Sequence, residues 1–221
     1  MDITLTAADG HTLTAYLNGP DDARAGVVVL PEIFGVNGYV RSVVDRYAAA
    51  GYRAISPSLF DRETAPRQGL QLGYSQEDVQ RGLGYKKAIA DETARLDIEA
   101  AAAALGQSVK LLTGYCWGGY LSWRMACLSD TFAAASCWHG GGIARHREDT
   151  PRIPVQMHFG GQDHSIPLSD VEQIRKAQPG VEIHVYEDAG HSFGRDATPA
   201  YRPEAAKLAW ERTLAFFARH A

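Results

Sequence analysis

The sequence predicts one domain of the α/β class, with a mostly parallel central sheet covered by helices on both faces. Three observations support this class. Apolar runs of strand length recur along the chain, helical patterns alternate with most of them, and 221 residues with 45% hydrophobic content suffice for one well-buried core. Such alternation requires right-handed crossovers and places functional groups on loops at the carboxyl ends of the strands.

The strands follow from two kinds of pattern. Residues 4–6 and 12–17 alternate between polar and apolar side chains across the turn Asp9-Gly10, which predicts an antiparallel hairpin at a sheet edge. The later runs are continuously apolar, as in strands buried on both faces. They predict strands over 26–30, 52–55, 109–113, 133–137, 155–159 and 182–186.

The helices are predicted between these strands. Helical patterns cover 40–50, 91–105 and 117–128, and Pro203 opens a last helix. Its core-facing stripe is predicted as Ala206, Trp210, Leu214 and Phe217, and Trp123 is expected to face the core from the helix over 117–128. Segment 57–84 is the least regular and is expected to form a loop and short helices over one rim of the sheet.

Charge and hydropathy exclude several functional classes. The net charge is −4 without a basic block, so nucleic acid is not expected as a partner. The first ten residues lack the apolar core of a signal peptide, and no apolar run reaches the roughly 18 residues of a membrane span. We therefore expect a cytoplasmic protein that contacts no nucleic acid and no membrane, and we expect it to be a monomer.

The cysteines and histidines show no metal-binding spacing. Cys116, Cys127 and Cys137 form no CxxC pair, which favours a reducing compartment, and we expect the last two to be buried apolar residues. The spacings of His139, His158, His164 and His184 match no ligand signature, even with Asp163 included. No metal and no cofactor are expected.

The run Gly114-Tyr115-Cys116-Trp117-Gly118-Gly119 directly follows an apolar strand pattern. Glycines two positions before and two positions after a single reactive side chain are typical of a nucleophile elbow, the sharp strand-to-helix turn that presents a nucleophile. Here the nucleophile is cysteine instead of serine. Cys116 is therefore the candidate nucleophile.

Two later loops supply the partners that a thiol nucleophile needs. Asp163 follows one predicted strand and His191 follows the next, so the chain order is nucleophile, acid, base, as in the α/β-hydrolase fold. The imidazole takes the thiol proton, and the carboxylate fixes the tautomer of the imidazole.

The oxyanion of such a reaction needs backbone N–H donors. Trp117 follows the nucleophile, and Ile33 lies in the loop 31–35 after the first long buried strand, so these two are the predicted donors. Glu32 beside Ile33 has two interpretations: its carboxylate either raises the thiol pKa by repulsion or accepts the thiol proton.

Together these segments resemble the dienelactone hydrolase (carboxymethylenebutenolidase) family. The motifs that carry the resemblance are PEIFGVN (31–37), GYCWGG (114–119), GGQDH (160–164), AGHSFGR (189–195) and ERTLAFF (211–217). The resemblance implies an α/β-hydrolase fold and a triad of Cys116, Asp163 and His191. It also implies that Glu32 holds the thiol in check until substrate binds.

The resemblance further implies how the substrate is held. Family enzymes bind the substrate carboxylate with two arginines, which correspond here to Arg81 and Arg195, and Tyr85 and Ser192 are placed with them in the substrate site. The implied activity is opening of the enol-lactone ring of dienelactone to maleylacetate, in the breakdown of aromatic compounds.

Four residues at three places in the chain depart from the family pattern and leave alternatives open. Pro31 stands where glutamine is frequent, Trp117 where leucine is frequent, and Trp138-His139 where a tyrosine pair is frequent. These changes bear on pocket size, and one side chain in an apolar pocket shifts discrimination by about 1–3 kcal/mol. A general ester or thioester hydrolase is therefore the first alternative, and a non-enzymatic thiol sensor or binding protein is the second.

Overall fold

The computed structural model describes residues 1–221, which fall into two compact units, Met1–Leu112 and Thr113–Ala221. Each unit combines strands with helices. Three strand pairs are parallel: β3 (Ala25–Leu30) with β4 (Arg53–Pro57), β6 (Ala134–Trp138) with β7 (Val155–Gly160), and β7 with β8 (Glu182–Tyr186). The predicted class, α/β with a mostly parallel sheet, is confirmed. No helix is long and apolar enough to cross a membrane. The single-domain organisation stays a prediction.

Four strands form the sheet of the first unit, in the order β1-β2-β4-β3. They are β1 (Asp2–Thr6), β2 (Thr12–Asn18), β3 (Ala25–Leu30) and β4 (Arg53–Pro57). β1 and β2 pair antiparallel with Leu5 opposite Leu13, which confirms the hairpin, and the parallel pair β3–β4 sets Val27 opposite Ala54. Every residue of β3 is buried, as its continuous apolar run predicts.

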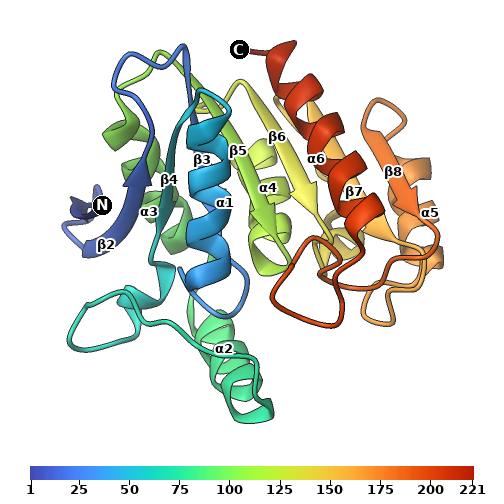
Figure 1. Ribbon diagram of the computed structural model, residues 1–221, viewed down its shortest axis with the longest axis horizontal. Helices are drawn as coiled ribbons and strands as arrows, with labels where there is room; N and C mark the ends of the chain where they lie inside the picture. Colours follow the sequence, from blue (N-terminus) through green and yellow to red (C-terminus); the bar gives the residue numbers. More distant parts are fainter. The chain divides into compact units, whose positions relative to one another are not determined.

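Two helices cover the faces of these strands. In Figure 1, α1 (Gly38–Ala49) lies in front of the strands and α3 (Asp91–Leu105) lies behind them. The side chain of Asn37 caps α1 by accepting a hydrogen bond from the N–H of Val40 at 3.2 Å. Gly106 ends α3 in a left-handed conformation, with φ +76°.

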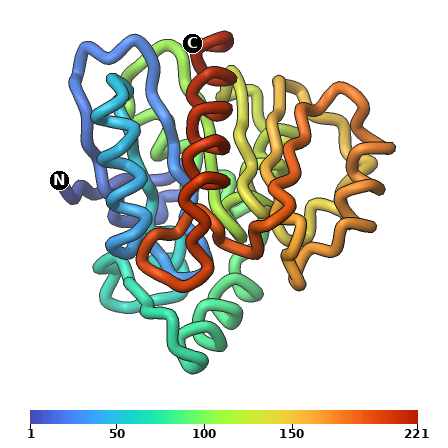
Figure 2. The backbone as a smooth tube through the Cα atoms, turned by 45° about the vertical axis from the view of Figure 1, so that its right-hand side comes forward, coloured from blue at the N-terminus to red at the C-terminus, as the bar shows by residue number.

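The prediction for segment 57–84 was partly wrong. A short 3-10 helix, Leu59–Arg62, is followed by a full α-helix, α2 (Gln76–Ala88), which runs beyond Gly84. The blue-green part of the tube in Figure 2 shows this segment continuing from the carboxyl end of β4. α2 buries only Gly82, so it has no apolar stripe that could reveal it. The remaining signal was the capping residue Ser75, whose hydroxyl accepts from the N–H of Asp78.

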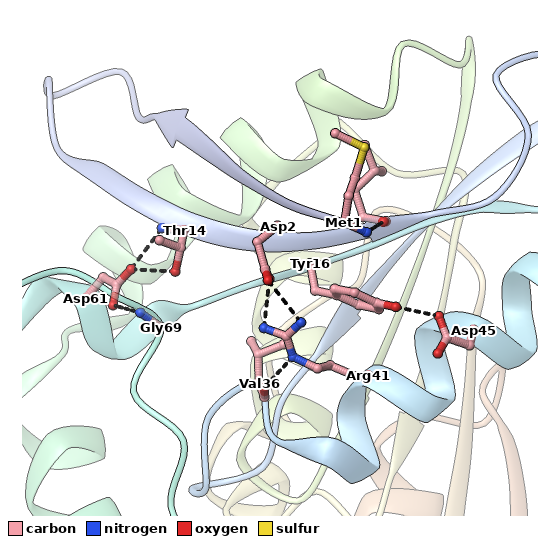
Figure 3. A network of polar contacts seen from close by, with 10 residues as sticks. Met1, Asp2, Thr14, Tyr16, Val36, Arg41, Asp45, Asp61 and Gly69 are labelled. Carbon is pink, nitrogen blue, oxygen red and sulfur yellow. Dashed lines mark hydrogen bonds and ion pairs between the residues drawn. The ribbon is translucent and has the colours of Figure 1, made fainter.

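Asp61 accepts three hydrogen bonds, two from Thr14 of β2 and one from Gly69 of its own segment (Figure 3). Its carboxylate accepts the N–H of Thr14 at 2.8 Å, the hydroxyl of Thr14 at 2.9 Å and the N–H of Gly69 at 3.0 Å. Asp61 is fully buried. A buried carboxylate is tolerated when its oxygens are satisfied in this way.

The second unit holds the remaining strands in the order β5-β6-β7-β8. They are β5 (Val109–Tyr115), which begins before the unit boundary, β6 (Ala134–Trp138), β7 (Val155–Gly160) and β8 (Glu182–Tyr186). β7 pairs parallel with both β6 and β8. Each strand matches its predicted run to within two residues, because a buried parallel strand carries an unbroken apolar pattern.

Helices of the second unit lie on both sides of its strands. α6 (Pro203–Ala218) lies in front in Figure 1, and α4 (Trp117–Leu128) lies behind. Two elements were not predicted: α5 (Leu168–Ala177) and the 3-10 helix Ile143–His146. α5 buries only Val171 and Ile174, so its apolar pattern is short.

The predicted core stripe of α6 needs correction. Trp210 and Leu214 are half-exposed, although Ala206 and Phe217 are buried as predicted. Steps of four residues advance about 40° further around a helix than a full turn, so a chain of such steps drifts off the buried face. The observed core residues mix steps of three and four: Ala206, Ala209, Thr213, Phe216 and Phe217.

Candidate active site

Cys116 is the single residue between the end of β5 and the start of α4, and its backbone conformation is strained. Its φ is +54° and its ψ is −110°, a combination that residues other than glycine rarely adopt. It is half-buried, whereas Cys127 and Cys137 are buried as predicted. Burial raises the pKa of both buried thiols, so these two stay protonated and unreactive.

The glycines around Cys116 allow a close approach of backbone segments. A Cβ on Gly114 would lie 2.1 Å from the carbonyl oxygen of Gly118, and a Cβ on Gly119 would lie 2.3 Å from that of Trp138. Neither distance is compatible with a side chain. The turn can therefore form only with glycine at these positions, which accounts for the motif.

Asp163 and His191 follow β7 and β8 and meet in the second unit. Nδ1 of His191 lies 2.7 Å from Oδ2 of Asp163. The other carboxylate oxygen, Oδ1, accepts the N–H groups of Ser165 at 2.8 Å and Ile166 at 3.2 Å. The loop after β7 thus fixes the carboxylate, and the carboxylate orients the ring.

The pKa of His191 reflects its two partners. Burial by itself lowers this pKa, but hydrogen bonds to Asp163 and to the side chain of Cys116 outweigh burial and raise the pKa to about 10. Their negative charge acts in the same direction. His191 therefore holds a proton between a carboxylate and the candidate nucleophile, which is the position that the base of a thiol nucleophile occupies.

Trp117 is the first residue of α4, directly after Cys116. N–H groups in the first turn of a helix have no acceptor within the helix and lie at its positive end. The backbone of Trp117 is thus suited to donate to an oxyanion formed at Cys116. Its indole is buried, so the backbone and not the ring is the relevant group.

His139 contacts the nucleophile, a role that was not predicted from the sequence. Its Nδ1 lies 3.1 Å from the backbone nitrogen of Cys116, and its ring centroid lies 4.8 Å from that of His191. The residue follows the end of β6 and has a positive φ of +38°. Its only sequence signal was its place after a buried strand, the position that Asp163 and His191 also occupy.

No group of three or more histidine, cysteine, aspartate or glutamate side chains is arranged to hold a metal ion. His158, considered above as a ligand, is instead buried in a hydrogen-bond network. Its Nδ1 lies 2.8 Å from the hydroxyl of Tyr186, and its Nε2 lies 3.0 Å from that of Thr213. This network joins β7, β8 and α6 below the loops that carry Asp163 and His191.

Comparison with known proteins assigns the family. Residues 13–221 match the model of the dienelactone hydrolase family. The chain belongs to the dienelactone hydrolase family. Carboxymethylenebutenolidases of Pseudomonas putida and Pseudomonas knackmussii are each 35% identical to it, over 98% of this chain and 95% of their own length.

Solved structures agree with this assignment. A crystal structure from Klebsiella pneumoniae matches with a TM-score of 0.82 at 29% identity and covers 99% of both chains. A dienelactone hydrolase-like phosphotriesterase from metagenomic libraries matches with a TM-score of 0.75 at 21% identity, which shows the shared fold alone. The chain has the α/β-hydrolase fold of the dienelactone hydrolase family and is a carboxylic-ester hydrolase.

The predicted substrate residues of the second unit lie close to the triad in sequence. Ser192 follows His191, is buried and has a positive φ of +59°. Arg195 is half-buried and donates from Nε to the hydroxyl of Thr198 at 3.3 Å. Its positive charge acts on the buried ring of His139, so the guanidinium lies within electrostatic reach of the triad.

The remaining predicted residues belong to the first unit. Glu32 and Ile33 are buried in the loop after β3, and a Cβ on Gly82 of α2 would lie 2.0 Å from the carbonyl oxygen of Ile33. Arg81 lines a cavity of about 560 Å³ together with Tyr85. The roles of these four residues stay predictions: Glu32, Ile33, Arg81 and Tyr85.

Proposed function

We propose that this enzyme opens the enol-lactone ring of dienelactone, a lactone that carries a carboxylate, and yields maleylacetate. One observation carries the proposal: His191 is held at 2.7 Å by Asp163 and hydrogen-bonds the side chain of Cys116. The names of the Pseudomonas relatives supply the reaction class. The proposal places the enzyme in the catabolism of aromatic, including chlorinated, compounds.

In the proposed first step, the thiolate of Cys116 attacks the lactone carbonyl carbon. The C–S bond forms, and the carbonyl oxygen becomes an oxyanion that accepts from the N–H of Trp117 and, by the family resemblance, that of Ile33. The ring C–O bond then breaks. The leaving enolate is stabilised by conjugation, so it can depart before it is protonated. It then takes up the proton of His191, which leaves the imidazole neutral.

In the second step, His191 activates water. The neutral imidazole removes a proton from the water, the resulting hydroxide attacks the thioester carbonyl, and the C–S bond breaks to restore the thiolate. The proton stays on His191 beside Asp163, which restores the resting pair. The product is the ring-opened acid. By the family resemblance, Glu32 keeps the thiol of Cys116 unreactive until substrate binds. Neither of the two steps requires this role of Glu32.

The test compares a carboxylated dienelactone with its methyl ester, following loss of the lactone chromophore. Because a hydrogen bond to a charged group contributes about 1.5–3 kcal/mol, we expect the acid to react roughly 10 to 100 times faster in kcat/KM. Arg195→Gln should remove most of this preference. Arg202→Gln is the control, since Arg202 is exposed and donates to backbone carbonyls of 199 and 201.

Equal rates for the two compounds would favour the alternative, a general ester or thioester hydrolase with the same triad. The departures at Trp117 and at Trp138-His139 make this alternative worth testing, because they alter the size of side chains beside the nucleophile. A thiol sensor would instead form a sulfenic acid with peroxide and release no acyl product. Loss of all turnover in Cys116→Ala separates either hydrolase from the sensor.

A further inference from the structure

We propose that His139 is a positioning residue for the nucleophile: its imidazole Nδ1 accepts the backbone N–H of Cys116 and so holds the strained turn in its reactive conformation. The inference rests on the proposed role of Cys116. It goes beyond the triad because it assigns a task to a second histidine that touches the nucleophile's backbone and not its sulfur.

The hydrogen bond fixes the tautomer of His139. The N–H of Cys116 is a donor, so Nδ1 at 3.1 Å must be unprotonated, and the ring proton of the neutral form is on Nε2. The N–H also lies 3.0 Å from the carbonyl oxygen of Trp138. Trp138, the last residue of β6, and His139, which follows it, thus both offer an acceptor to the N–H of Cys116, the residue whose backbone is strained.

Burial keeps this acceptor available. His139 is 1% exposed, and burial lowers its pKa well below the ordinary value. The positive charges of His191 and Arg195 lower it further, and His158 contributes in the same direction. A protonated His139 would lose the acceptor and place a second cation beside His191. The surroundings of the ring therefore maintain the one protonation state that can accept from Cys116.

The backbone conformation and the burial of His139 both cost folding free energy. His139 has a positive φ of +38°, and its Nε2 is buried without a hydrogen-bond partner. Backbone strain of this kind costs about 1–3 kcal/mol, and an unsatisfied buried donor costs a similar amount. An apolar residue would avoid the second cost. Such costs cluster at functional sites, which agrees with a role for Nδ1.

The neighbouring backbone holds the ring in place. The N–H of His139 donates to the carbonyl oxygen of His158 at 2.7 Å. On the other side, a Cβ on Gly140 would lie 2.8 Å from the nitrogen of Tyr120 in α4. The end of β6 and the start of α4 are thus in close contact, which sets the distance between His139 and Cys116.

The test uses two variants of His139. In His139→Asn, the side-chain oxygen can take the place of Nδ1, and asparagine tolerates a positive φ. His139→Phe keeps a planar ring but removes the acceptor. We expect kcat to fall about tenfold in the Phe variant, the effect of roughly one hydrogen bond, with KM unchanged. The Asn variant should stay within about threefold of the parent enzyme.

A second readout does not depend on substrate. The rate of alkylation of Cys116 by iodoacetamide, measured from about pH 5 to pH 9, reports the thiolate; Cys127 and Cys137 are buried and do not compete. In the Asn variant the apparent pKa of this profile should match that of the parent, since His139 acts by position and is neutral in both. A shifted profile, equal kcat values in the two variants, or a loss confined to KM would overturn the proposal.

The experiments distinguish a failure of the proposed function from a failure of the positioning role of His139. Turnover in Cys116→Ala would remove the proposed function and this inference with it. If Cys116 is required but both His139 variants behave like the parent, only the inference fails. Should the Phe variant not fold, the Asn variant decides alone, because a tenfold or greater loss of kcat in a folded Asn variant contradicts the acceptor role.

Discussion

Nδ1 of His191 lies 2.7 Å from Oδ2 of Asp163, while the other oxygen of the same carboxylate accepts two backbone N–H groups. The carboxylate is therefore anchored on one side and orients the imidazole on the other. This division of its two oxygens sets both the direction of the ring and its raised pKa.

Asp163→Asn should disable the enzyme without unfolding it. The amide cannot stabilise an imidazolium as the carboxylate does, so we expect the pKa of His191 to fall, although Cys116 still acts to raise it, and kcat to fall by about 10² to 10⁴. Steady-state kinetics and an NMR titration of the His191 ring measure the two effects. Asp188→Asn is the control, since this carboxylate is exposed and lies three residues before His191. A parental kcat in Asp163→Asn would contradict the assigned role.

Stability should fall at alkaline pH because of His191. Its pKa is about 10 in the folded enzyme, above the value of about 6.5 for an unfolded chain. The proton is therefore bound more tightly in the folded state. Its stabilising effect is complete below about pH 6.5 and is lost as pH rises to about 10. Urea unfolding at both pH values should show this loss in the parent, and His191→Gln should show a smaller loss. If the free energy of unfolding depended on pH equally in the parent and in His191→Gln, the prediction would be refuted.

Buried apolar elements could be predicted from the sequence, and elements without an apolar face could not. The strand β3 and the helix α3 were predicted almost to the residue. Burial of β3 on both faces leaves an unbroken apolar run, and burial of one face of α3 leaves a helical period. α5 was missed, and α2 was anticipated only as one of several short helices without bounds, since α5 buries two residues and α2 buries one. Their formation depends on caps and tertiary contacts that leave little trace in hydropathy.

The same distinction applies to the site. Cys116, Asp163 and His191 were predicted because each follows a strand and has a residue type that the chemistry requires. The contact of His139 with the backbone of Cys116 could not be predicted, as it depends on the close approach of β6 and α4 at Gly119 and Gly140. Chain order defines which loops share a sheet edge, but not which ring atom reaches which N–H.

Gly119→Ala should disturb this approach. The new Cβ would lie 2.3 Å from the carbonyl oxygen of Trp138, so the backbone must shift, at a cost of about 1–3 kcal/mol and with a lower kcat. Gly141→Ala is the matched control, because a Cβ there meets no atom within 4 Å. Thermal unfolding and kinetics of both variants check the prediction. A parental melting temperature in Gly119→Ala would argue against the packing described.

Asp61→Asn should destabilise the first unit. The amide nitrogen would face an N–H donor in place of an acceptor, which leaves buried groups unsatisfied and costs about 2–4 kcal/mol. Asp45→Asn is the control, because Asp45 is an exposed carboxylate that accepts hydrogen bonds from Tyr16 and Asn18. We expect this change to lower the free energy of unfolding by less than about 1 kcal/mol. Urea unfolding of the two variants compares them directly. Similar values would show that the Asp61 network adds little.

The most direct test of the central claim is the mass of an acid-quenched intermediate. Ring opening leaves the alcohol part of the ester attached to the acyl group, so attack by Cys116 adds the whole mass of the lactone to the enzyme. We expect this mass on the proteolytic peptide 111–124, which contains Cys116 and no other cysteine, and we expect neither adduct nor turnover in Cys116→Ala. Turnover by Cys116→Ala, or an adduct on another peptide, would contradict a thiol nucleophile at this position.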